Sequence, residues 1–457
     1  MFRSFCLLFL FTTLYLGCID GKDAINLSPD LSLLFSTDTL TFDTLLTERT
    51  SITKRMRVIN NNKDAVLLDE ISVGGGKASP YQVIINGRIG QMLEGEVLQG
   101  GDSLLILVQV TIDPTDQNLP FLVKDSLLVA WNGNQSDIKL VAWGQDAHYV
   151  SQEIFCDDVW VSDKPYVIQD IVMVDSLCKL EIEKGTKIYF DKEAKLIVKG
   201  ELIVNGDSGS HVIFRNARFD EQFMEAPGQW SGIFFYPGSS GVFSYTIIEN
   251  ARDGIFAFGS SDRSFQVKLS IDHSILRFMS STGIKVFDAD VDMTNSLVYD
   301  CGEYLAAHFS GGRYRYDHCT LVNQPSTFIR EQASLVFLDN YPSGGEDPFQ
   351  NPLSIVLKNS IVWGVQDEEL YIGNDGGQLL DAKLMDNIIR STETLQSNFT
   401  STESDFPGFK NTYSYDYRLD SLAFARDKLS LSEVSDDIRG LARDDQPDIG
   451  AYERIDP

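Results

Sequence analysis

Residues 273–298, HSILRFMSSTGIKVFDADVDMTNSLV, contain one short pattern twice. A polar residue, a serine and two apolar residues recur as His273-Ser274-Ile275-Leu276 and as Asn295-Ser296-Leu297-Val298. The same pattern, with Ser or Thr in second place, begins at Tyr245, Cys319 and Asn359. The Ser/Thr positions are 246, 274, 296, 320 and 360, so most repeats follow one another at a spacing in the twenties. A recurrence of this length predicts a β-solenoid with three short strands in each coil.

The last separation, between Thr320 and Ser360, is longer than the others and has two explanations. It corresponds either to one coil with a loop inserted near Asp339–Pro352 or to two coils, one of which has a weak repeat. Similar β-like runs, Leu180–Phe190 and Leu196–Val204, extend the repetitive region upstream. Because one coil cannot bury its apolar face alone, stacked coils are expected to share a continuous apolar interior.

The region before the repeats alternates polar and apolar residues with a period of two, which is typical of strands with one buried face. Turn-forming clusters such as Asn60–Asp64 and Asn132–Asn134 separate these runs. Short strands at this density predict a β-sandwich. The expected strands are Thr39–Asp43, Thr50–Ile59, Ala65–Ser72, Tyr81–Ile85, Ser103–Ile112, Lys124–Ala130 and Ile138–Trp143.

Three stretches carry resemblances to known families. LTFDTLLTERTSITKRMRVINNN, residues 40–62, resembles the opening of immunoglobulin-like domains of the abnormal-spindle/hydin type, which implies a spacer or docking module. Gly228–Ile233 (GQWSGI) and the closing segment Pro447–Glu453, preceded by Asp437-x-x-Gly440-x-x-Arg443, resemble exported lipoproteins with a right-handed parallel β-helix of the pectate-lyase-like superfamily. The expected fold is therefore all-β, a β-sandwich followed by a right-handed parallel β-helix.

The N-terminus has the features of an export signal. Arg3 precedes the apolar run Phe5–Leu16, which is too short to span a bilayer permanently. Leu14-Tyr15-Leu16-Gly17-Cys18 resembles a bacterial lipobox, which implies acylation of Cys18 and anchoring in a membrane. The resemblance further implies an outer-membrane lipoprotein of the Gram-negative envelope, which faces the cell surface or the periplasm. The alternative is an ordinary signal peptide with an incidental cysteine.

The expected domains follow from these features. They are a signal peptide (1–17), a lipidated tether (18–37), an immunoglobulin-like sandwich (38–147), the β-helix (148–397) and a C-terminal coil and cap (398–457).

The charge balance limits the classes of partner that the chain is expected to bind. Lys+Arg 38 against Asp+Glu 66 gives a net charge of −28, which argues against nucleic acid as a partner because binding to phosphates needs clustered cations. Hydrophobic residues make up 43% of the chain, too many for an unfolded acidic protein. The expected partners are the membrane through the lipid anchor, a polysaccharide, and another envelope protein through the sandwich.

Four cysteines remain after Cys6 and Cys18, and an exported protein can oxidise them. They allow three pairings, which the sequence does not distinguish. Cys156 and Cys178 lie about one coil apart, so stacking and a disulfide are both open to them.

The best catalytic candidates are basic. On a strand, Arg313 and Arg315 share one face, while Tyr314 and Tyr316 share the other. The resemblance to β-helix lyases implies a Lys or Arg base, so Lys285 joins Arg313 and Arg315 as weak candidates, with His308 as a further neighbour. The alternative is ion pairing on the surface of an acidic protein.

Asp288, Asp290 and Asp292 form a DxDxD pattern. A calcium loop of the EF type fails because Met293 and Tyr299 stand where Gly and Glu are required. Calcium in another geometry is the one cofactor for which these residues are weak candidates, and a solvated strand edge is the favoured alternative.

Two further groups are expected to serve packing. The residues before the repeated Ser/Thr, among them His273, are expected to turn inward at a coil corner. Trp230 is expected to pack at a corner, and Trp160 and Trp363 to be buried, although both are alternative sugar platforms.

The favoured function is a non-catalytic, lipid-anchored envelope protein that presents its β-helix for glycan or surface interaction. The alternative is a polysaccharide lyase or hydrolase acting on an acidic polysaccharide. A lyase requires Lys285 and Arg315 to converge in a groove, whereas a binding protein is expected to show exposed aromatic residues along one face of the helix.

Overall fold

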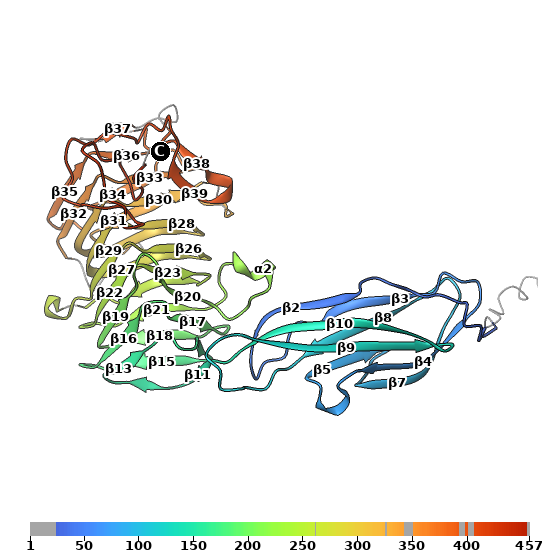
Figure 1. Ribbon diagram of the computed structural model, residues 1–457. Coiled ribbons are helices and arrows are strands. Elements are labelled where there is room, and N and C mark those ends of the chain that lie inside the picture. Colours follow the sequence, from blue (N-terminus) through green and yellow to red (C-terminus); the bar gives the residue numbers. More distant parts are fainter. Residues whose placement is uncertain are drawn as a thin grey trace, which may run out of the picture. The chain divides into compact units, whose positions relative to one another are not determined.

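In the computed structural model of the chain, residues 24–260, 262–324, 327–341, 351–392, 398–400 and 406–454 are described (Figure 1). The chain divides into two compact units, Met1–Asp146 and Ala147–Pro457. The predicted fold class is confirmed, since both units are built of β-strands and the second consists of stacked parallel strands. Among the described residues, none of the helices is long and apolar enough to cross a membrane.

The first unit consists of two five-stranded sheets that enclose one apolar core. Alternate residues of each strand point into this core, including Phe42, Tyr81, Ile106 and Leu127. One sheet contains, in order, β1 (Leu34–Phe35), β3 (Lys54–Ile59), β8 (Ser103–Val110), β5 (Tyr81–Ile85) and β6 (Arg88–Gly90). The other contains β2 (Thr39–Leu46), β10 (Asn134–Gln145), β9 (Phe121–Trp131), β4 (Val66–Val73) and β7 (Met92–Leu98).

Three of these strands, β1, β6 and β7, were not expected from the pattern. β5 and β6 form a hairpin through Asn86-Gly87, both with positive φ (50° and 76°). An Asn-Gly pair between β-like runs is a strong hairpin signal, which could have identified β6. The equivalent pair Asn132-Gly133 connects β9 and β10 as expected.

Each coil of the second unit contributes to an 11-stranded and a 16-stranded sheet. The 11-stranded sheet contains β11 (His148–Val150), β14 (Tyr166–Ile168), β17 (Lys187–Phe190), β20 (Val212–Asn216), β23 (Thr246–Glu249), β26 (Ile275–Met279), β28 (Leu297–Cys301), β30 (Thr320–Asn323), β33 (Ile361–Gly364), β36 (Asn387–Ile389) and β37 (Asn398–Thr400). A short helix, α2 (Glu221–Met224), interrupts one coil.

The 16-stranded sheet has two arms, joined where β27 (Thr282–Thr294) and β29 (Tyr304–Asp317) run through both. The first arm contains β12 (Ile154–Phe155), β15 (Ile171–Val174), β18 (Lys195–Val198), β21 (Gly232–Phe235), β24 (Asp253–Ala257), β31 (Leu335–Leu338) and β34 (Leu370–Gly373). The second arm contains β13 (Asp158–Trp160), β16 (Lys179–Glu183), β19 (Glu201–Asn205), β22 (Ser240–Ser244), β25 (Lys268–Asp272), β32 (Leu353–Lys358) and β35 (Leu380–Met385).

The repeated serine closes the corner between the second arm and the 11-stranded sheet. Its hydroxyl donates to the carbonyl two residues earlier, as Ser274 does to Asp272 at 2.8 Å. The same oxygen accepts the backbone N–H of its counterpart in the preceding coil, as Ser274 does from Thr246 at 3.2 Å. The residue before the serine adopts a left-handed backbone, with φ of 47° at His273 and 45° at Asn295.

The repeat near residue 320 lies one position earlier than expected. Thr320 pairs with Leu297 and Ile361, so Cys319 occupies the serine position and His318 the preceding one. The Cys319 thiol donates to the Asp317 carbonyl at 3.5 Å, as the serine hydroxyls do in their coils. Because β30 pairs directly with β33, the long separation before Ser360 is one coil with an insertion.

The solenoid interior is apolar and continuous from Val150 to Ile389. Trp230 lies within it as expected, stacked on Phe190 with ring centroids 3.9 Å apart, and its indole donates to the Glu249 carbonyl at 2.8 Å. Trp160 and Trp363 are also buried, at 3% and 1% exposure, which removes them as sugar platforms.

The described part of the C-terminal segment, 406–454, covers the side of the 11-stranded sheet. β38 (Phe409–Asn411) and β39 (Asp416–Leu419) pair with each other and pack on Tyr299 and Trp363. Arg443 donates to the Asn295 side chain at 3.0 Å and pairs with buried Glu453 at 3.1 Å. The closing motif, expected to form a cap, thus attaches this segment laterally to the coil corners.

Cys156 and Cys178 form a disulfide between adjacent coils, 22 residues apart in sequence. Cys301 and Cys319 are free thiols in the solenoid interior. Burial raises the pKa of each free thiol far above the usual range, so neither is a reactive nucleophile.

Candidate functional site

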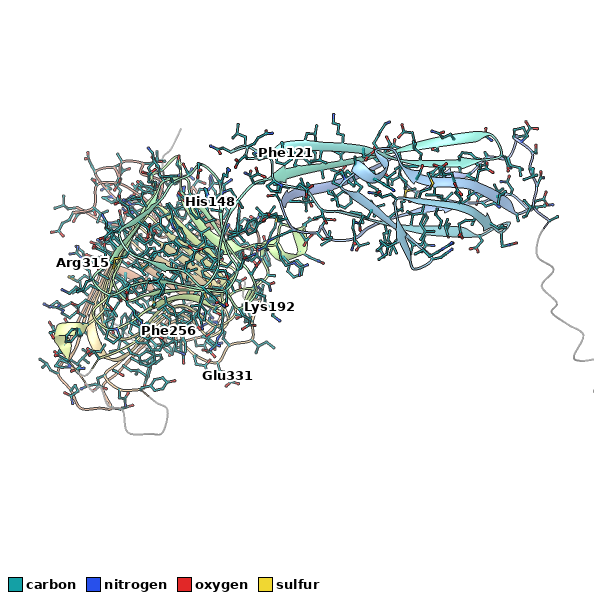
Figure 2. The ribbon with its side chains drawn as sticks, turned by 90° about the horizontal axis from the view of Figure 1, so that it is seen from below. Phe121, His148, Lys192, Phe256, Arg315 and Glu331 are labelled. Atoms are coloured by element: carbon teal, nitrogen blue, oxygen red, sulfur yellow. A yellow bond between two sulfur atoms is a disulfide. The ribbon has the colours of Figure 1, made fainter. Side chains whose placement is uncertain are left out.

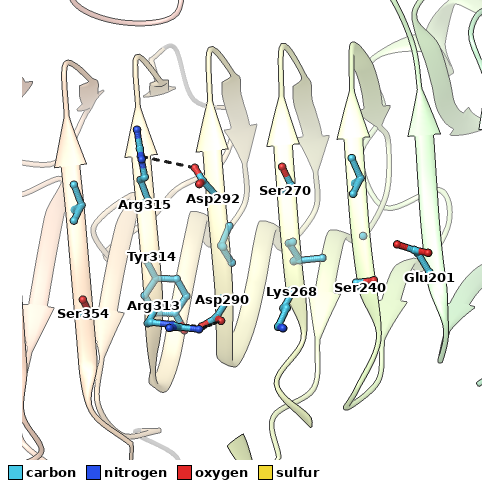
Figure 3. A pocket seen from close by; sticks show the side chains of 15 residues that line it. Glu201, Ser240, Lys268, Ser270, Asp290, Asp292, Arg313, Tyr314, Arg315 and Ser354 are labelled. Atoms are coloured by element: carbon cyan, nitrogen blue, oxygen red, sulfur yellow. Dashed lines mark hydrogen bonds and ion pairs between the residues drawn. The ribbon is translucent and has the colours of Figure 1, made fainter. Parts of the chain in front are cut away.

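A groove of about 450 Å³ crosses the outer face of the second arm (Figure 3). It runs over β19, β22, β25, β27, β29 and β32, whose outward side chains lie in register. Small residues, Ser240, Gly241 and Ser270, form part of its floor. Arg313 and Arg315 line its downstream part, on the face that strand alternation predicts, while Tyr314 and Tyr316 are buried.

Both arginines are held in ion pairs. Arg313 Nε donates to Asp290 at 2.9 Å, and its Nη2 binds the second carboxylate oxygen. Hydrogen bonding to Asp290 raises the pKa of Arg313 above its ordinary value. Arg315 lies 3.2 Å from Asp317 and 3.9 Å from Asp292. These contacts match the surface ion pairing that was the alternative to a catalytic role.

Asp288, Asp290 and Asp292 do not share a face, which corrects their suggested role as a calcium site. The alternation of inward and outward side chains along β27 is interrupted at Asp288, where φ is 42° and the register between β27 and β29 shifts. Asp288 is buried and accepts a hydrogen bond from Gln266 at 2.6 Å, while burial raises its pKa. No group of three or more His, Cys, Asp or Glu side chains suited to a metal occurs among the described residues.

Lys285 lies on the other arm, which corrects the proposed catalytic group. It pairs with Phe256 of β24 and Ala307 of β29, before the bend at Asp288, whereas Arg313 and Arg315 follow the equivalent bend in β29. Figure 2 shows Phe256 and Arg315 on different sides of the solenoid. The three basic residues therefore do not converge on one sugar, as a lyase built on them would require.

His308 is likewise excluded from the groove because its side chain points into the solenoid. Its Nδ1 lies 3.0 Å from the Val336 carbonyl and its Nε2 lies 2.8 Å from the Tyr316 hydroxyl. Burial lowers the pKa of His308 to about 3. His308 is thus a neutral core residue at physiological pH.

His273 lies at the coil corner that the sequence assigned to packing. It stacks on Tyr245 with centroids 4.4 Å apart, and its Nδ1 lies 2.7 Å from Asp272. Its Nε2 lies 3.4 Å from Asp436 of the C-terminal segment. This corner connects coils and the C-terminal segment and lies outside the groove.

Aromatic residues gather on the outer face of the first arm, in a set that we call the aromatic stripe. Phe234 of β21, Phe256 of β24 and Phe287 of β27 stack in succession, with centroids 5.6 and 5.7 Å apart. The stripe consists of Phe234, Tyr236, Phe256, Phe258, Phe287, Tyr304, Phe309 and Tyr341, joined by successive ring contacts. Phe309 is buried at 3% exposure, and Phe234, Phe256, Phe287 and Tyr304 are partly buried, so the stripe is a largely half-buried aromatic row.

Several rings of the stripe reach solvent. Tyr236, Phe258 and Tyr341 are each 36% exposed. Lys195 and Lys199 border the upstream end, with their ammonium groups 5.9 Å from the Phe234 ring and 6.0 Å from the Tyr236 ring. Such a row was expected for a binding protein but was not located in the sequence, although aligning the Gly-Ile pairs at 232, 254 and 283 places Phe234 beside Phe256.

Comparison with known proteins assigns no family. No family model matches the chain, and no curated protein matches it. Parts of the chain are similar in structure to a family 123 glycoside hydrolase from Clostridium perfringens (5% identity, 28% of this chain, 30% of that chain, TM-score 0.20) and to the E. coli chaperone DraB (14% identity, 24% and 55%, 0.17). A third similarity is to a PapD-like domain of human CEP192 (10% identity, 29% and 94%, 0.18). The match spans less than two thirds of the hydrolase and of the chaperone.

Proposed function

We propose that this chain is a lipid-anchored protein of the Gram-negative cell envelope that binds a polysaccharide through its β-helix without catalysis. The observation that carries the proposal is the aromatic stripe on the first arm. Aromatic rings combine a large apolar contact area with little conformational entropy to lose, which suits the apolar ring faces of sugars. The stripe crosses successive coils, so its direction suits a polymer.

Polar groups beside the rings suit the hydroxyl groups of such a ligand. Lys195, Lys199 and Lys285 lie on the first arm, and Tyr236 and Tyr341 carry hydroxyls at exposed rings. The net charge of −28 favours a neutral polysaccharide over an acidic one, because like charges repel at long range.

The stripe makes a specific prediction for binding. Replacing Tyr236 and Phe258 together with Ala should weaken binding to a recognised polysaccharide about 10- to 100-fold, since interface aromatics contribute about 1–3 kcal/mol. Affinity electrophoresis against neutral and acidic polysaccharides measures this change. Tyr413→Ala, at a ring that is 86% exposed on the C-terminal segment, is the control and should have no effect.

Two outcomes would contradict the proposal. If the unaltered protein binds no polysaccharide of a broad panel, the proposed polysaccharide binding is wrong. Equal binding by the double variant and the Tyr413→Ala control would show that the ligand contacts another surface.

The anchor part of the proposal rests on the lipobox-like residues Leu14–Cys18, which lie outside the described residues. Cys18→Ala should abolish acylation and release the protein from membranes. Membrane fractionation, with mass measurement of the N-terminal peptide, tests this. Unchanged fractionation, or an N-terminal peptide without acyl mass in the unaltered protein, would exclude the lipoprotein assignment.

The first unit supports a supplementary role. As an immunoglobulin-like sandwich it would act as a spacer between the anchor and the β-helix, and as a docking surface for another envelope protein.

A further inference from the structure

The outer face of the second arm carries two parallel rows of side chains from β16 to β35, and Figure 3 shows the part of these rows between Glu201 and Ser354. One row begins with Lys179 and ends with Asp381, and the adjacent row begins with Glu181 and ends with Lys383. The remaining positions of the two rows are three serines, Ile203 and the partly buried valines of β22 and β32. We call this surface the charged face.

Read backwards, the charged face inverts its charge at both ends of the two rows and at the centre of the first row, while its other positions set a charged or apolar residue against an uncharged one. The first row opens with positive Lys179 and closes with negative Asp381. In the same row, positive Lys268 of β25 and negative Asp290 of β27 are neighbours at the centre. A surface with this property is complementary to a second copy of itself after a half-turn about a two-fold axis.

We propose that two copies of this chain associate through the charged face, about a two-fold axis that runs parallel to the strands between β25 and β27. Lys179 then faces Asp381 of the second copy, and Lys268 faces Asp290 of the second copy. In the adjacent row, Glu181 faces Lys383 of the second copy. Opposite charges therefore meet at both ends and at the centre of the interface.

The shape of the charged face agrees with this placement. The groove is bordered upstream by the small or half-buried Ser240 and Val242. The axis places Arg313 and Arg315 of the second copy opposite these two residues. The Arg313 and Arg315 side chains are 64% and 45% exposed, so their guanidinium groups reach the surface opposite the hollow while they stay paired with Asp290 and Asp317. Glu201 lines the same part of the groove and offers an anionic neighbour to the entering guanidinium groups.

Two neighbouring placements of the axis bring like charges together. An axis centred on β25 sets Lys268 against itself. An axis centred on β27 sets Asp290 against itself and Lys268 against Arg313. Like charges in direct opposition are strongly unfavourable at an interface, which disfavours both placements. An axis between β27 and β29 sets Asp290 against Arg313 and Asp292 against Arg315, but it leaves β16 and β19 outside the contact, whereas the axis between β25 and β27 uses the whole face.

The size of the face predicts a weak dimer. Strands about 4.8 Å apart make the face about 34 Å long from β16 to β35, and the two rows together with a third outward residue on each strand make it roughly 17 Å wide. The area is then about 600 Å² on each copy, at the lower end of the range for specific complexes. Association should therefore be concentration-dependent, and salt screens both the opposed charges of the face and the long-range repulsion between two chains of net charge −28.

A charge exchange that preserves the pairs within one copy tests the proposal. Lys179 and Glu181 lie 3.1 Å apart, and Asp381 and Lys383 lie 3.8 Å apart. The first variant carries K179E and E181K, which keeps the local pair and the net charge but opposes like charges across the axis. The second adds D381K and K383D, which restores opposite charges everywhere. The control exchanges the exposed pair Lys139 and Asp137 of the first unit.

Sedimentation velocity on the chain from residue 18 onward, carrying Cys18→Ala to remove the acyl group, measures the dimer between about 1 and 200 µM. The first variant should dimerise at least 10-fold more weakly, while the second and the control should match the unaltered chain within about threefold. A monomer at all concentrations, an unaffected first variant, or a second variant that fails to recover would overturn the proposal.

A disulfide-linked dimer formed by a chain with I203C and V356C, which face each other across the axis, tests the arrangement independently of charge. Loss of polysaccharide binding in the first variant without a change in mass would instead assign this face to the ligand.

Discussion

Replacing Glu369 with Ala should lower the free energy of unfolding by about 3–5 kcal/mol, because the substitution leaves a charge buried without its partner. The side chains of Glu369 and Arg330 are both 0% exposed, and Arg330 Nη2 lies 3.2 Å from the carboxylate. The same carboxylate accepts the backbone N–H of Ser334 at 2.9 Å and that of Gln366 at 2.8 Å. Both backbone groups would lose their acceptor together with Arg330.

Urea unfolding followed by tryptophan fluorescence measures this change, since Trp160, Trp230 and Trp363 lie in the solenoid unit. The paired variant R330M with E369L should recover most of the loss, because an apolar pair needs no charge partner. Glu369→Gln, which keeps the shape of the side chain, should lie between. A loss below about 1 kcal/mol for Glu369→Ala would mean that water reaches Arg330 and that the pair is not structural.

The repetitive fold could be predicted because Thr246, Ser274, Ser296 and Ser360 each donate their hydroxyl to the carbonyl two residues earlier, at the same corner of successive coils. Ser274, Ser296 and Ser360 stood out in the sequence because the hydroxyl oxygen of each one accepts the backbone N–H of its counterpart in the preceding coil. The predicted alignment of the repeat was wrong at Cys319 because this residue lacks the hydroxyl that identifies the other repeats. A thiol replaces the hydroxyl there, and the adjacent Thr320 resembles the repeat more closely than Cys319 does.

The interaction surfaces were harder to predict because their residues come from different coils. Phe234, Phe256 and Phe287 are neighbours in space, but their separations in the sequence are unequal. Insertions of different length in each coil conceal their alignment. The bend at Asp288 was also not predicted from the sequence. Because its backbone is left-handed, Lys285 before the bend lies on the first arm, and the residues that pair with Arg313 after it lie on the second. Strand alternation alone predicts one continuous face there.

Acidification should destabilise the solenoid through His308, which is the second large effect expected. The ring is 0% exposed, so its neutral form is favoured and its pKa falls to about 3, against about 6.5 in the unfolded chain. Between these two values the unfolded chain binds more protons, so the free energy of unfolding increases with pH through this window. The contribution of His308 is complete above about pH 6.5, and about 3 kcal/mol of it is lost at pH 4.5.

Other buried groups also titrate in this range, so a variant is needed to isolate His308. Burial lowers the pKa of His318 to about 2, which adds to the loss in acid. Asp448 and Glu453 oppose it, because burial raises their pKa values to about 6 and about 7 and so favours the folded state when they are protonated. The contribution of these three groups is the same in the unaltered chain and in a His308 variant, so it cancels in their difference.

His308→Gln should therefore reduce the dependence of stability on pH by about 3 kcal/mol between pH 7 and pH 4.5. A glutamine amide can donate to the Val336 carbonyl and accept from the Tyr316 hydroxyl, the two partners that His308 has, but it cannot become charged. Urea unfolding of both proteins at pH 7 and pH 4.5 gives the difference directly. Identical slopes with pH would show that His308 is solvated or paired when protonated, and would contradict its place in a closed solenoid interior.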